Sequence, residues 1–205
     1  MKTNILIKNL INELENLPMS NETESVGTEE DKANMKLEYQ WDIFHYNESN
    51  VPLDRLCYDY ILHEYIRELV FNTINFDIFK DIGLDWAFVR KYESEGRASL
   101  SPHFDSDQYT INIMLSEPND YEGGEFIYCP SKYFNEAFKA HSIEDKLELL
   151  KKLTKENRAH VLKPNKGDII VLMGQHQDKI PPNLHCVYPV TKGVRYVLCL
   201  FFDKT

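Results

Sequence analysis

The sequence has no stretch of about 18 apolar residues, the length that a helix needs to cross a bilayer. Its N-terminal segment, MKTNILIKNLINELENL, mixes charged and amide side chains with apolar ones. It therefore lacks the unbroken apolar core and the small-residue cleavage site of a signal peptide, and is typical of a short amphipathic helix. These absences predict a soluble, cytoplasmic protein that has no membrane partner.

Cysteine pairs and positive charge are also scarce. The four cysteines form no CxxC pair, and a chain of 205 residues can bury a core without disulfides, so we expect free thiols in a reducing compartment. Acidic residues number 33 against 23 basic ones, giving a formal net charge of -10, and no dense basic run is present. An extended phosphate-binding surface would oppose this average field. Nucleic acid is therefore disfavoured as a partner.

The first 84 residues are predicted to form an N-terminal helical region. Residues 53–71 carry apolar side chains at helical spacing, and residues 1–17 form the first predicted helix. Between them, residues 19–36 are polar and acidic, a composition typical of a flexible connection or surface loop. We expect these helices to cover a sheet formed by the rest of the chain.

From residue 85 onward the apolar pattern has a period of two, which is typical of strands. Strands are predicted at residues 85–93, 108–115, 124–129, 168–173 and 194–202, with turn residues between them. Short strands after a helical region predict a mainly β fold. We expect a double-stranded β-helix (jelly roll) over residues 85–205, buttressed by the N-terminal helices.

A helical insertion is predicted at about residues 132–157. Within it, Ser142 and Asp145 form a capping-box pattern, and the leucines that follow lie on one stripe. Two interpretations stay open: a surface helix that covers the sheet, and a lid or substrate-docking element.

Three residues in the C-terminal half have the pattern of a metal site. His103 and Asp105 lie two residues apart at the predicted end of a strand, so both side chains project to one side. An H-x-D pair alone is common by chance, but His185 adds a second imidazole. Two imidazoles and one carboxylate on one face of Fe(II) leave three positions open, the arrangement of non-haem iron oxygenases.

Arg195, ten residues after His185, lies in an apolar predicted strand. An unpaired buried charge is costly, so this guanidinium needs an anionic partner. Its fork matches a carboxylate of a dicarboxylate co-substrate, and an internal Asp or Glu is the alternative. The strand period places Cys199 on the same face, and places Thr110 and Asn112 on the inner face of the 108–115 strand. For Asn112, an amide satisfied by backbone groups is the alternative to a co-substrate contact.

The run SLSPHFDSDQYTINIMLSEPNDYEGGEF, with KGDIIVLM and HCVYPVTKGVRYVLCLFFD, resembles the catalytic domain of 2-oxoglutarate-dependent prolyl and lysyl hydroxylases. The likeness to procollagen lysyl hydroxylases is greatest in the Pro-His-x-Asp, Thr-Ile-Asn-Ile, Asp-Tyr-Glu-Gly-Gly and Gly-x-Arg-Tyr elements, and it covers residues 88–205. It implies an Fe(II) site and a co-substrate site made of these residues: His103, Asp105 and His185 as iron ligands, Arg195 on the distal carboxylate of 2-oxoglutarate, and Tyr92 reaching that co-substrate.

The resemblance implies a dioxygenase that uses O2 and 2-oxoglutarate to hydroxylate a C–H bond, releasing succinate and CO2. A prolyl or lysyl residue of a polypeptide is the expected substrate. A small-molecule oxygenase acting on an amino acid or metabolite, and a non-catalytic metal-binding jelly-roll module, are the alternatives. The need for ascorbate and the oligomeric state stay open.

Two segments depart from the family pattern. The segment 174–184, ahead of His185, is longer than usual, and the helical insertion is additional. Both are expected to flank the mouth of the pocket. His176 lies in the first of them and is an alternative ligand, but the matching spacing from His185 to Arg195 favours His185.

Overall fold

The computed structural model describes residues 2–17, 19, 40–45, 83–176 and 180–203. The helix predicted at residues 53–71 lies outside the described residues, as does the connection predicted at 19–36 apart from Met19. No helix in the described part of the chain has both the length and the apolar character of a membrane span.

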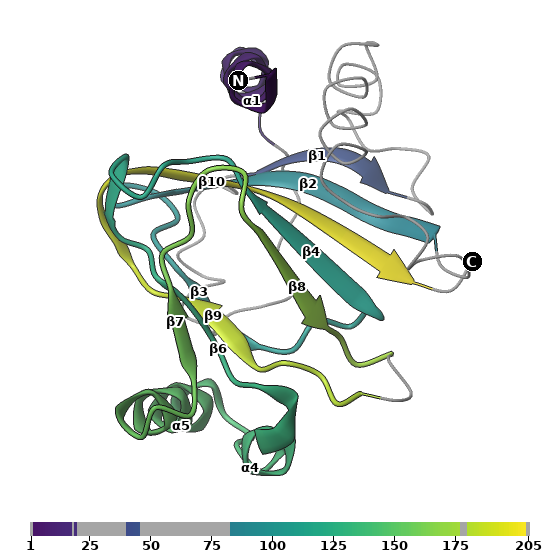
Figure 1. Cartoon of the computed structure of the whole chain (residues 1–205), viewed down its shortest axis with the longest axis vertical. Coiled ribbons are helices and arrows are strands. Elements are labelled where there is room, and N and C mark those ends of the chain that lie inside the picture. The colour runs from purple at the N-terminus through teal and green to yellow at the C-terminus, as the bar shows by residue number, and fades with distance from the viewer. Residues whose placement is uncertain (1, 18, 20–39, 46–82, 177–179, 204–205) are drawn as a thin grey trace.

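Two antiparallel sheets make up most of the described structure (Figure 1). The strands of the larger sheet are β1 (Gln40–His45), β2 (Gly83–Glu93), β4 (Tyr109–Met114), β5 (Tyr121–Gly123), β8 (Ile169–Met173) and β10 (Val190–Asp203). The strands of the smaller sheet are β3 (Leu100–His103), β6 (Phe126–Tyr128), β7 (His160–Leu162) and β9 (His185–Val187). The larger sheet has the order β1-β2-β10-β4-β8, with β5 paired to the start of β10, and the smaller has the order β3-β9-β6-β7.

Few helices accompany the sheets in the part of the chain that the structure describes. They are α1 (Lys2–Leu14), the 3-10 turn η3 (Ser131–Tyr133), α4 (Phe134–Phe138) and α5 (Ile143–Lys155). Helix α1 lies on the outer side of the larger sheet, whereas α4 and α5 lie beyond the smaller sheet (Figure 1). The prediction of a mainly β fold is confirmed.

Strand β1 is the main departure from the sequence prediction. It pairs with β2 and extends the larger sheet, although only helix and connection were predicted for the first 84 residues. A six-residue segment, QWDIFH, is too short for its periodicity to separate strand from helix, and its pairing with β2 decides the outcome. The division of the chain at residue 84 stays a prediction, but the N-terminal region contributes to the sheet.

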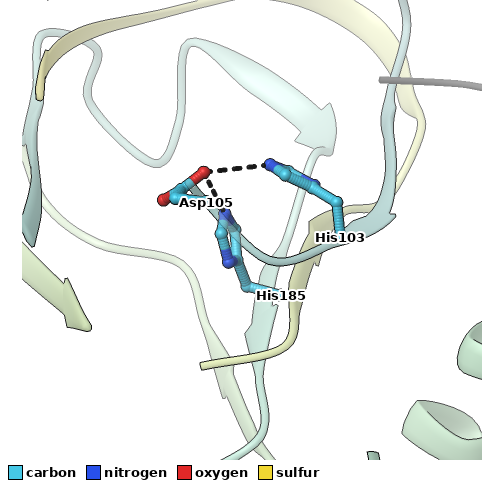
Figure 2. A group of neighbouring side chains, drawn as sticks. All are labelled: His103, Asp105 and His185. Atoms are coloured by element: carbon cyan, nitrogen blue, oxygen red, sulfur yellow. Dashed lines mark ion pairs between the residues drawn. The ribbon is translucent and has the colours of Figure 1, made fainter. Parts of the chain in front are cut away.

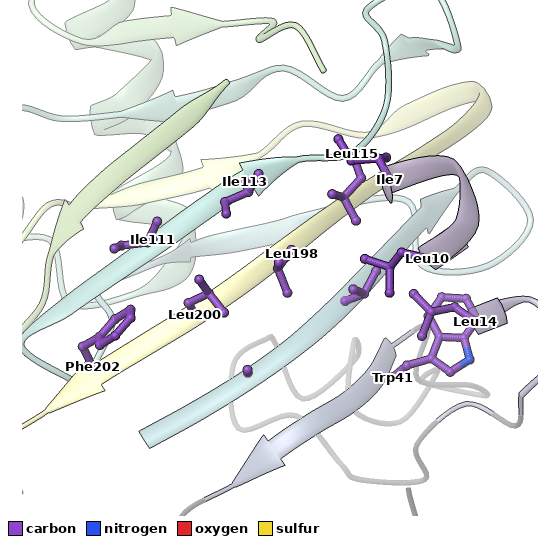
Figure 3. Close-up of a cluster of buried hydrophobic side chains, with 12 residues drawn as sticks. Ile7, Leu10, Leu14, Trp41, Ile111, Ile113, Leu115, Leu198, Leu200 and Phe202 are labelled. Carbon is purple, nitrogen blue, oxygen red and sulfur yellow. The ribbon is translucent and has the colours of Figure 1, made fainter. Parts of the chain in front are cut away.

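The outer face of the larger sheet is apolar and packs against α1. Figure 3 shows this cluster, whose labelled members are Ile7, Leu10, Leu14, Trp41, Ile111, Ile113, Leu115, Leu198, Leu200 and Phe202. Two polar contacts add to the packing, since Trp41 Nε1 donates to the Leu17 carbonyl at 3.2 Å and Lys91 Nζ lies 3.3 Å from a Glu15 carboxylate oxygen. The side-chain alternation predicted for β4 and β10 is confirmed, so their inner faces are free to line a cavity.

Helix α5 begins with the predicted capping box. The Asp145 amide donates to Ser142 Oγ at 3.0 Å, and the Ser142 amide donates to the Asp145 carboxylate at 3.5 Å. Leu150 and Leu153 are fully buried in a cluster with Ile127 of β6 and other outer-face residues of the smaller sheet. These contacts favour the interpretation of α5 as a surface helix that covers this sheet.

Candidate active site

A cavity of about 400 Å³ is lined by residues of both sheets. The larger sheet contributes residues that include Phe88, Asn112 and Arg195, and the smaller sheet contributes His103 and His185. The predicted inner faces of β4 and β10 therefore line one cavity together with residues of the smaller sheet.

Three side chains predicted to bind metal converge in this cavity. His103 ends β3 and His185 begins β9, and the two residues are direct partners across these antiparallel strands. Asp105 follows His103 by two residues. One ligand atom from each of the three side chains lies within 4.8 Å of the others. Figure 2 shows the Asp105 carboxylate facing both imidazoles, with its Oδ1 atom 3.2 Å from His103 Nε2 and 3.6 Å from His185 Nε2.

Backbone carbonyls fix the tautomer of both imidazoles. His103 Nδ1 donates to the Ser101 carbonyl at 2.8 Å, and His185 Nδ1 donates to the Asn183 carbonyl at 3.0 Å. Each neutral ring then has its lone pair on Nε2, the atom that faces Asp105. Lone pairs that face a carboxylate repel it unless a cation lies between them, and a carbonyl bonded to the other ring nitrogen is the usual support of a metal-binding histidine.

Burial and charge around Asp105 also fit a divalent cation. The residue is 6% exposed, and its Oδ2 atom has no hydrogen-bond partner. Burial alone would raise the pKa of this carboxyl, but the charge of His185, once protonated in the acidic range where the carboxyl titrates, and the contact with His103 outweigh burial and hold the pKa below its usual range. Asp105 is therefore ionised at neutral pH. Two imidazoles and one carboxylate suit Fe(II) and leave further coordination positions to other ligands.

We expect the metal-free protein to lose stability as the pH falls from about 6.5 to 4. Burial lowers the pKa of His185 from 6.5 to about 4. Between these pH values His185 is protonated in the unfolded chain but not in the folded protein, so the free energy of unfolding decreases with decreasing pH. Urea unfolding of chelator-treated protein across this range would measure the effect. A His185→Gln variant should show a shallower dependence, and an identical pH dependence in both proteins would contradict the assignment.

Arg195 is buried beside the triad without a carboxylate partner among the described residues. It is 1% exposed, and its Nε and Nη1 atoms have no hydrogen-bond partner. Its guanidinium lies 5.1 Å from the ring centroid of Tyr92, which faces it across β2 and β10. No internal Asp or Glu partner, the alternative considered from the sequence, is found within the described ranges. The two free donors match an anion that enters the cavity.

The other predicted co-substrate residues also line the cavity. Tyr92 is 2% exposed, Thr110 is 2%, Cys199 is 8% and Asn112 is 9%. The Thr110 hydroxyl has no hydrogen-bond partner, which leaves it available to a ligand. Burial raises the pKa of Cys199 to about 12, so this thiol stays protonated at neutral pH. Their contacts with a co-substrate stay predictions.

Tyr121 was not predicted from the sequence as a site residue. It lies next to Arg195, in the buried cluster that also contains Val197 and Cys199. It is 3% exposed, and its hydroxyl has no hydrogen-bond partner. Burial raises the pKa of Tyr121, although the nearby Arg195 charge opposes this shift. The phenol therefore stays a hydrogen-bond donor at neutral pH. The sequence showed that Tyr121 belongs to the Asp-Tyr-Glu-Gly-Gly element. It did not show that β5 pairs with β10, which is the pairing that brings Tyr121 to Arg195.

Asn183 was also missed, and it joins three parts of the site. Its Oδ1 atom accepts from the Met173 amide at 2.9 Å, and its Nδ2 atom donates to the Cys129 carbonyl at 3.2 Å. Its own carbonyl accepts from His185 Nδ1. Asn183 thus ties the end of β8 and the end of β6 to the orientation of a candidate metal ligand.

The segment before His185 holds the Asp105 loop in place. The Gln175 amide donates to the Asp105 carbonyl at 2.8 Å, and Gly174 lies so close that an added Cβ would be 1.9 Å from the Asp107 carbonyl oxygen. His176, the alternative ligand, forms an ion pair with Asp203 at 2.6 Å instead of joining the triad. The structure therefore favours His185.

Similarity to known proteins supports this site. A procollagen lysyl hydroxylase and glycosyltransferase of Acanthamoeba polyphaga mimivirus is 41% identical over 80 residues, 38% of this chain and 9% of the relative. The procollagen-lysine,2-oxoglutarate 5-dioxygenase 1 of Bos taurus is 30% identical over 120 residues, 58% of this chain and 12% of the relative. The chain thus spans only about a tenth of the length of these curated relatives. No protein-family model matches the chain.

Two solved structures show the same fold at low sequence identity. A 2OG-Fe(II) oxygenase family oxidoreductase from Burkholderia pseudomallei has a TM-score of 0.50 at 13% identity, over 97% of this chain and 78% of the other. A prolyl hydroxylase from Trichoplax adhaerens, in complex with a peptide fragment of the hypoxia inducible factor oxygen degradation domain, has a TM-score of 0.51 at 14% identity. This match covers 100% of this chain and 79% of the other.

The fold, the His103–Asp105–His185 triad and the distant relatives agree. The chain therefore has the fold of 2-oxoglutarate- and Fe(II)-dependent oxygenases together with the metal triad His103, Asp105 and His185. Over 38% to 58% of its length, it is similar to the lysyl hydroxylases named above.

Proposed function

We propose that this protein is an Fe(II)- and 2-oxoglutarate-dependent hydroxylase of a prolyl or lysyl residue in a polypeptide, built on a double-stranded β-helix. One observation carries the proposal. A cavity open to ligands brings together a complete metal triad and a buried arginine whose donors lack partners. A metal-binding module has no need for the arginine, whereas an oxygenase needs both.

Each part of the cavity has a distinct role in this proposal. When bound, Fe(II) and 2-oxoglutarate supply the oxidation, in which 2-oxoglutarate is converted with O2 to succinate and CO2 and a substrate C–H bond is hydroxylated. His103, Asp105 and His185 hold the metal, and Arg195 orients the distal carboxylate of 2-oxoglutarate. Apolar walls such as Phe88 and Val197 keep bulk water away from the reacting groups.

The cavity lining contains aromatic rings and a further carboxylate. Trp86, Phe88 and Phe201 form an aromatic wall, with ring centroids 4.5 to 5.5 Å apart, and the Arg90 guanidinium lies 4.7 Å from the Phe88 centroid. Asp107 lines the same cavity, is 8% exposed, and accepts a hydrogen bond from Ser106 Oγ at 3.0 Å. Aromatic faces and a carboxylate in one cavity suit an ammonium group. We infer from this lining a preference for a lysyl over a prolyl substrate.

We expect Asp107→Asn to weaken the use of lysine-containing peptides about tenfold, the effect of one lost charge pair in a partly buried site. The KM for such peptides should rise, while the KM for 2-oxoglutarate and the use of proline-containing peptides should not change. Steady-state kinetics on both peptide classes would measure this. Glu117→Gln, an exposed change outside the cavity lining, is the control. Equal effects on both peptide classes would contradict a charge-specific role.

Succinate formation tests the proposed function. Protein purified anaerobically would receive Fe(II), 2-oxoglutarate and air, with and without panels of lysine- and proline-containing peptides. We expect one peptide class to stimulate succinate formation. Turnover that only amino acids or small metabolites stimulate would move the proposal to a small-molecule oxygenase. Absence of turnover in metal-loaded protein would contradict an oxygenase.

A further inference from the structure

An aromatic strip runs from the cavity lining to α4. Phe104 lies between His103 and Asp105 in the sequence, lines the cavity and packs against the cluster under α5. Its ring meets the Phe134 ring edge-on with centroids 5.9 Å apart, and the Phe134 and Phe138 centroids are 5.2 Å apart. We call Phe104, Phe134 and Phe138 the aromatic strip. Through Phe104, the strip connects α4, part of the predicted insertion, to the cavity lining.

The outer end of the strip is exposed on an anchored helix. Phe138 is 63% exposed, the highest value among the large apolar side chains in the described part of the chain. Its neighbour Ala137 is 1% exposed and packs in the cluster beneath α5. Arg158 pairs with Glu136 of α4, which fixes the helix to the segment after α5. The exposure of Phe138 is therefore a feature of a fixed surface, and a contiguous apolar surface beside a site is typical of binding.

Lysines lie beside the strip in a protein of net charge -10, while Glu136 of α4 is paired with Arg158. Lys146 Nζ lies 5.8 Å from the Phe104 ring centroid, and Lys132 Nζ lies 4.9 Å from that of Tyr133, the residue before α4. The strip therefore suits an apolar side chain with neutral or acidic neighbours.

The dimensions of the strip fit a polypeptide. The two steps between ring centroids take the strip at most about 11 Å from Phe104 to Phe138. An extended chain rises about 3.3 Å per residue, so this length corresponds to about three residues. Counted from Phe104, which lies between the candidate ligands His103 and Asp105 in the sequence, the strip can therefore contact about three residues of one extended segment.

We propose that the aromatic strip binds the segment of a polypeptide substrate that flanks the reacting residue, and receives an apolar side chain three to four positions away from it. This inference rests on the proposed function and narrows it, because a free amino acid or small metabolite would not reach Phe138. The strip would add affinity without touching the metal or the co-substrate.

A series of fluorescently labelled peptides tests this proposal. Each peptide consists of glycine and serine, with one lysine or proline at its centre and one leucine. The position of the leucine relative to the central residue differs from peptide to peptide. Their binding to protein loaded with Mn(II) and 2-oxoglutarate without oxygen would be followed by fluorescence anisotropy. We expect leucine at the third or fourth position on one side to tighten binding about fivefold, the effect of burying part of a leucine side chain. Phe138→Ser should abolish this gain, and Phe138→Leu should retain most of it.

A matched control separates the strip from general surface effects. Val161→Ser changes another exposed apolar residue, 46% exposed on β7, and should keep the leucine gain. Peptide-free succinate formation should be the same in Phe138→Ser and the parent protein, because the strip lies outside the site of chemistry. If the parent protein turns over 2-oxoglutarate but leucine position has no effect on binding, the strip proposal is wrong while the proposed function stands.

Two other results would also overturn the strip proposal. Loss, in Phe138→Ser, of a concentration-dependent dimer that sedimentation shows for the parent protein would assign the strip to a second copy of the chain. Selective loss of binding to anionic vesicles would assign it to a membrane surface. Absence of 2-oxoglutarate turnover in the parent protein, in contrast, would contradict the proposed function itself.

Discussion

Replacing His185 with alanine should abolish metal binding, whereas replacing His176 should not. His185 supplies one of three ligand atoms within 4.8 Å of one another, while His176 pairs with Asp203. Loss of one ligand from a three-ligand site should lower metal affinity by at least about 100-fold, since outer-shell changes alone cost about 10- to 100-fold. Metal content after dialysis and calorimetric titration with Mn(II) would measure it.

This pair of variants compares two histidines that lie nine residues apart in the sequence. His185 is buried and His176 is exposed, so circular dichroism should first establish that the His185 variant is folded, and His185→Gln provides a less disruptive second variant. Succinate formation should vanish in both His185 variants and persist in His176→Ala. Retained metal affinity in His185→Gln together with its loss in His176→Ala would reverse the ligand assignment.

Arg195→Met should raise the 2-oxoglutarate concentration needed for half-saturation by about 30-fold or more. Methionine fills a similar volume but removes the Nε and Nη1 donors that lack partners within the protein. Loss of a buried charge-assisted contact costs about 2 to 5 kcal/mol, which corresponds to a factor of about 30 to several thousand. Equilibrium binding of 2-oxoglutarate to Mn(II)-loaded protein would measure the effect independently of turnover.

Metal affinity should be unchanged in Arg195→Met, because the arginine is not a ligand. Arg158→Met is a suitable control: Arg158 forms ion pairs with Glu136 and Glu156 on the outer surface, away from the cavity lining. Unaltered 2-oxoglutarate binding in Arg195→Met would remove the arginine from the co-substrate site.

The residues that could be predicted from the sequence are those whose position follows from local spacing. A period of two was enough to place Arg195 and Cys199 on the inner face of β10 and Asn112 on the inner face of the neighbouring strand β4. Two-residue spacing and strand ends likewise brought His103 and Asp105 together. These relations depend only on strand geometry, so neither distant contacts nor an exact register was needed.

The features that were missed depend on contacts between distant segments. Strand β1 is defined by its pairing with β2, some 45 residues further along the chain, rather than by its own pattern. Tyr121 reaches Arg195 only because β5 pairs with the start of β10. Asn183 joins the ends of β6 and β8 through its side chain. A single sequence carries no signal for such long-range pairings, so these residues became visible only in the assembled fold.

Tracing oxygen from labelled O2 tests the central claim most directly. Fe(II)-loaded protein would be incubated with 2-oxoglutarate and the most stimulating peptide under 18O2, and both products would be analysed by mass spectrometry. We expect one labelled oxygen atom in succinate and one in a hydroxylated lysyl or prolyl residue, with both labels lost in Arg195→Met at low 2-oxoglutarate. Hydroxylation without label, or labelled product formed without 2-oxoglutarate, would contradict a 2-oxoglutarate-dependent dioxygenase.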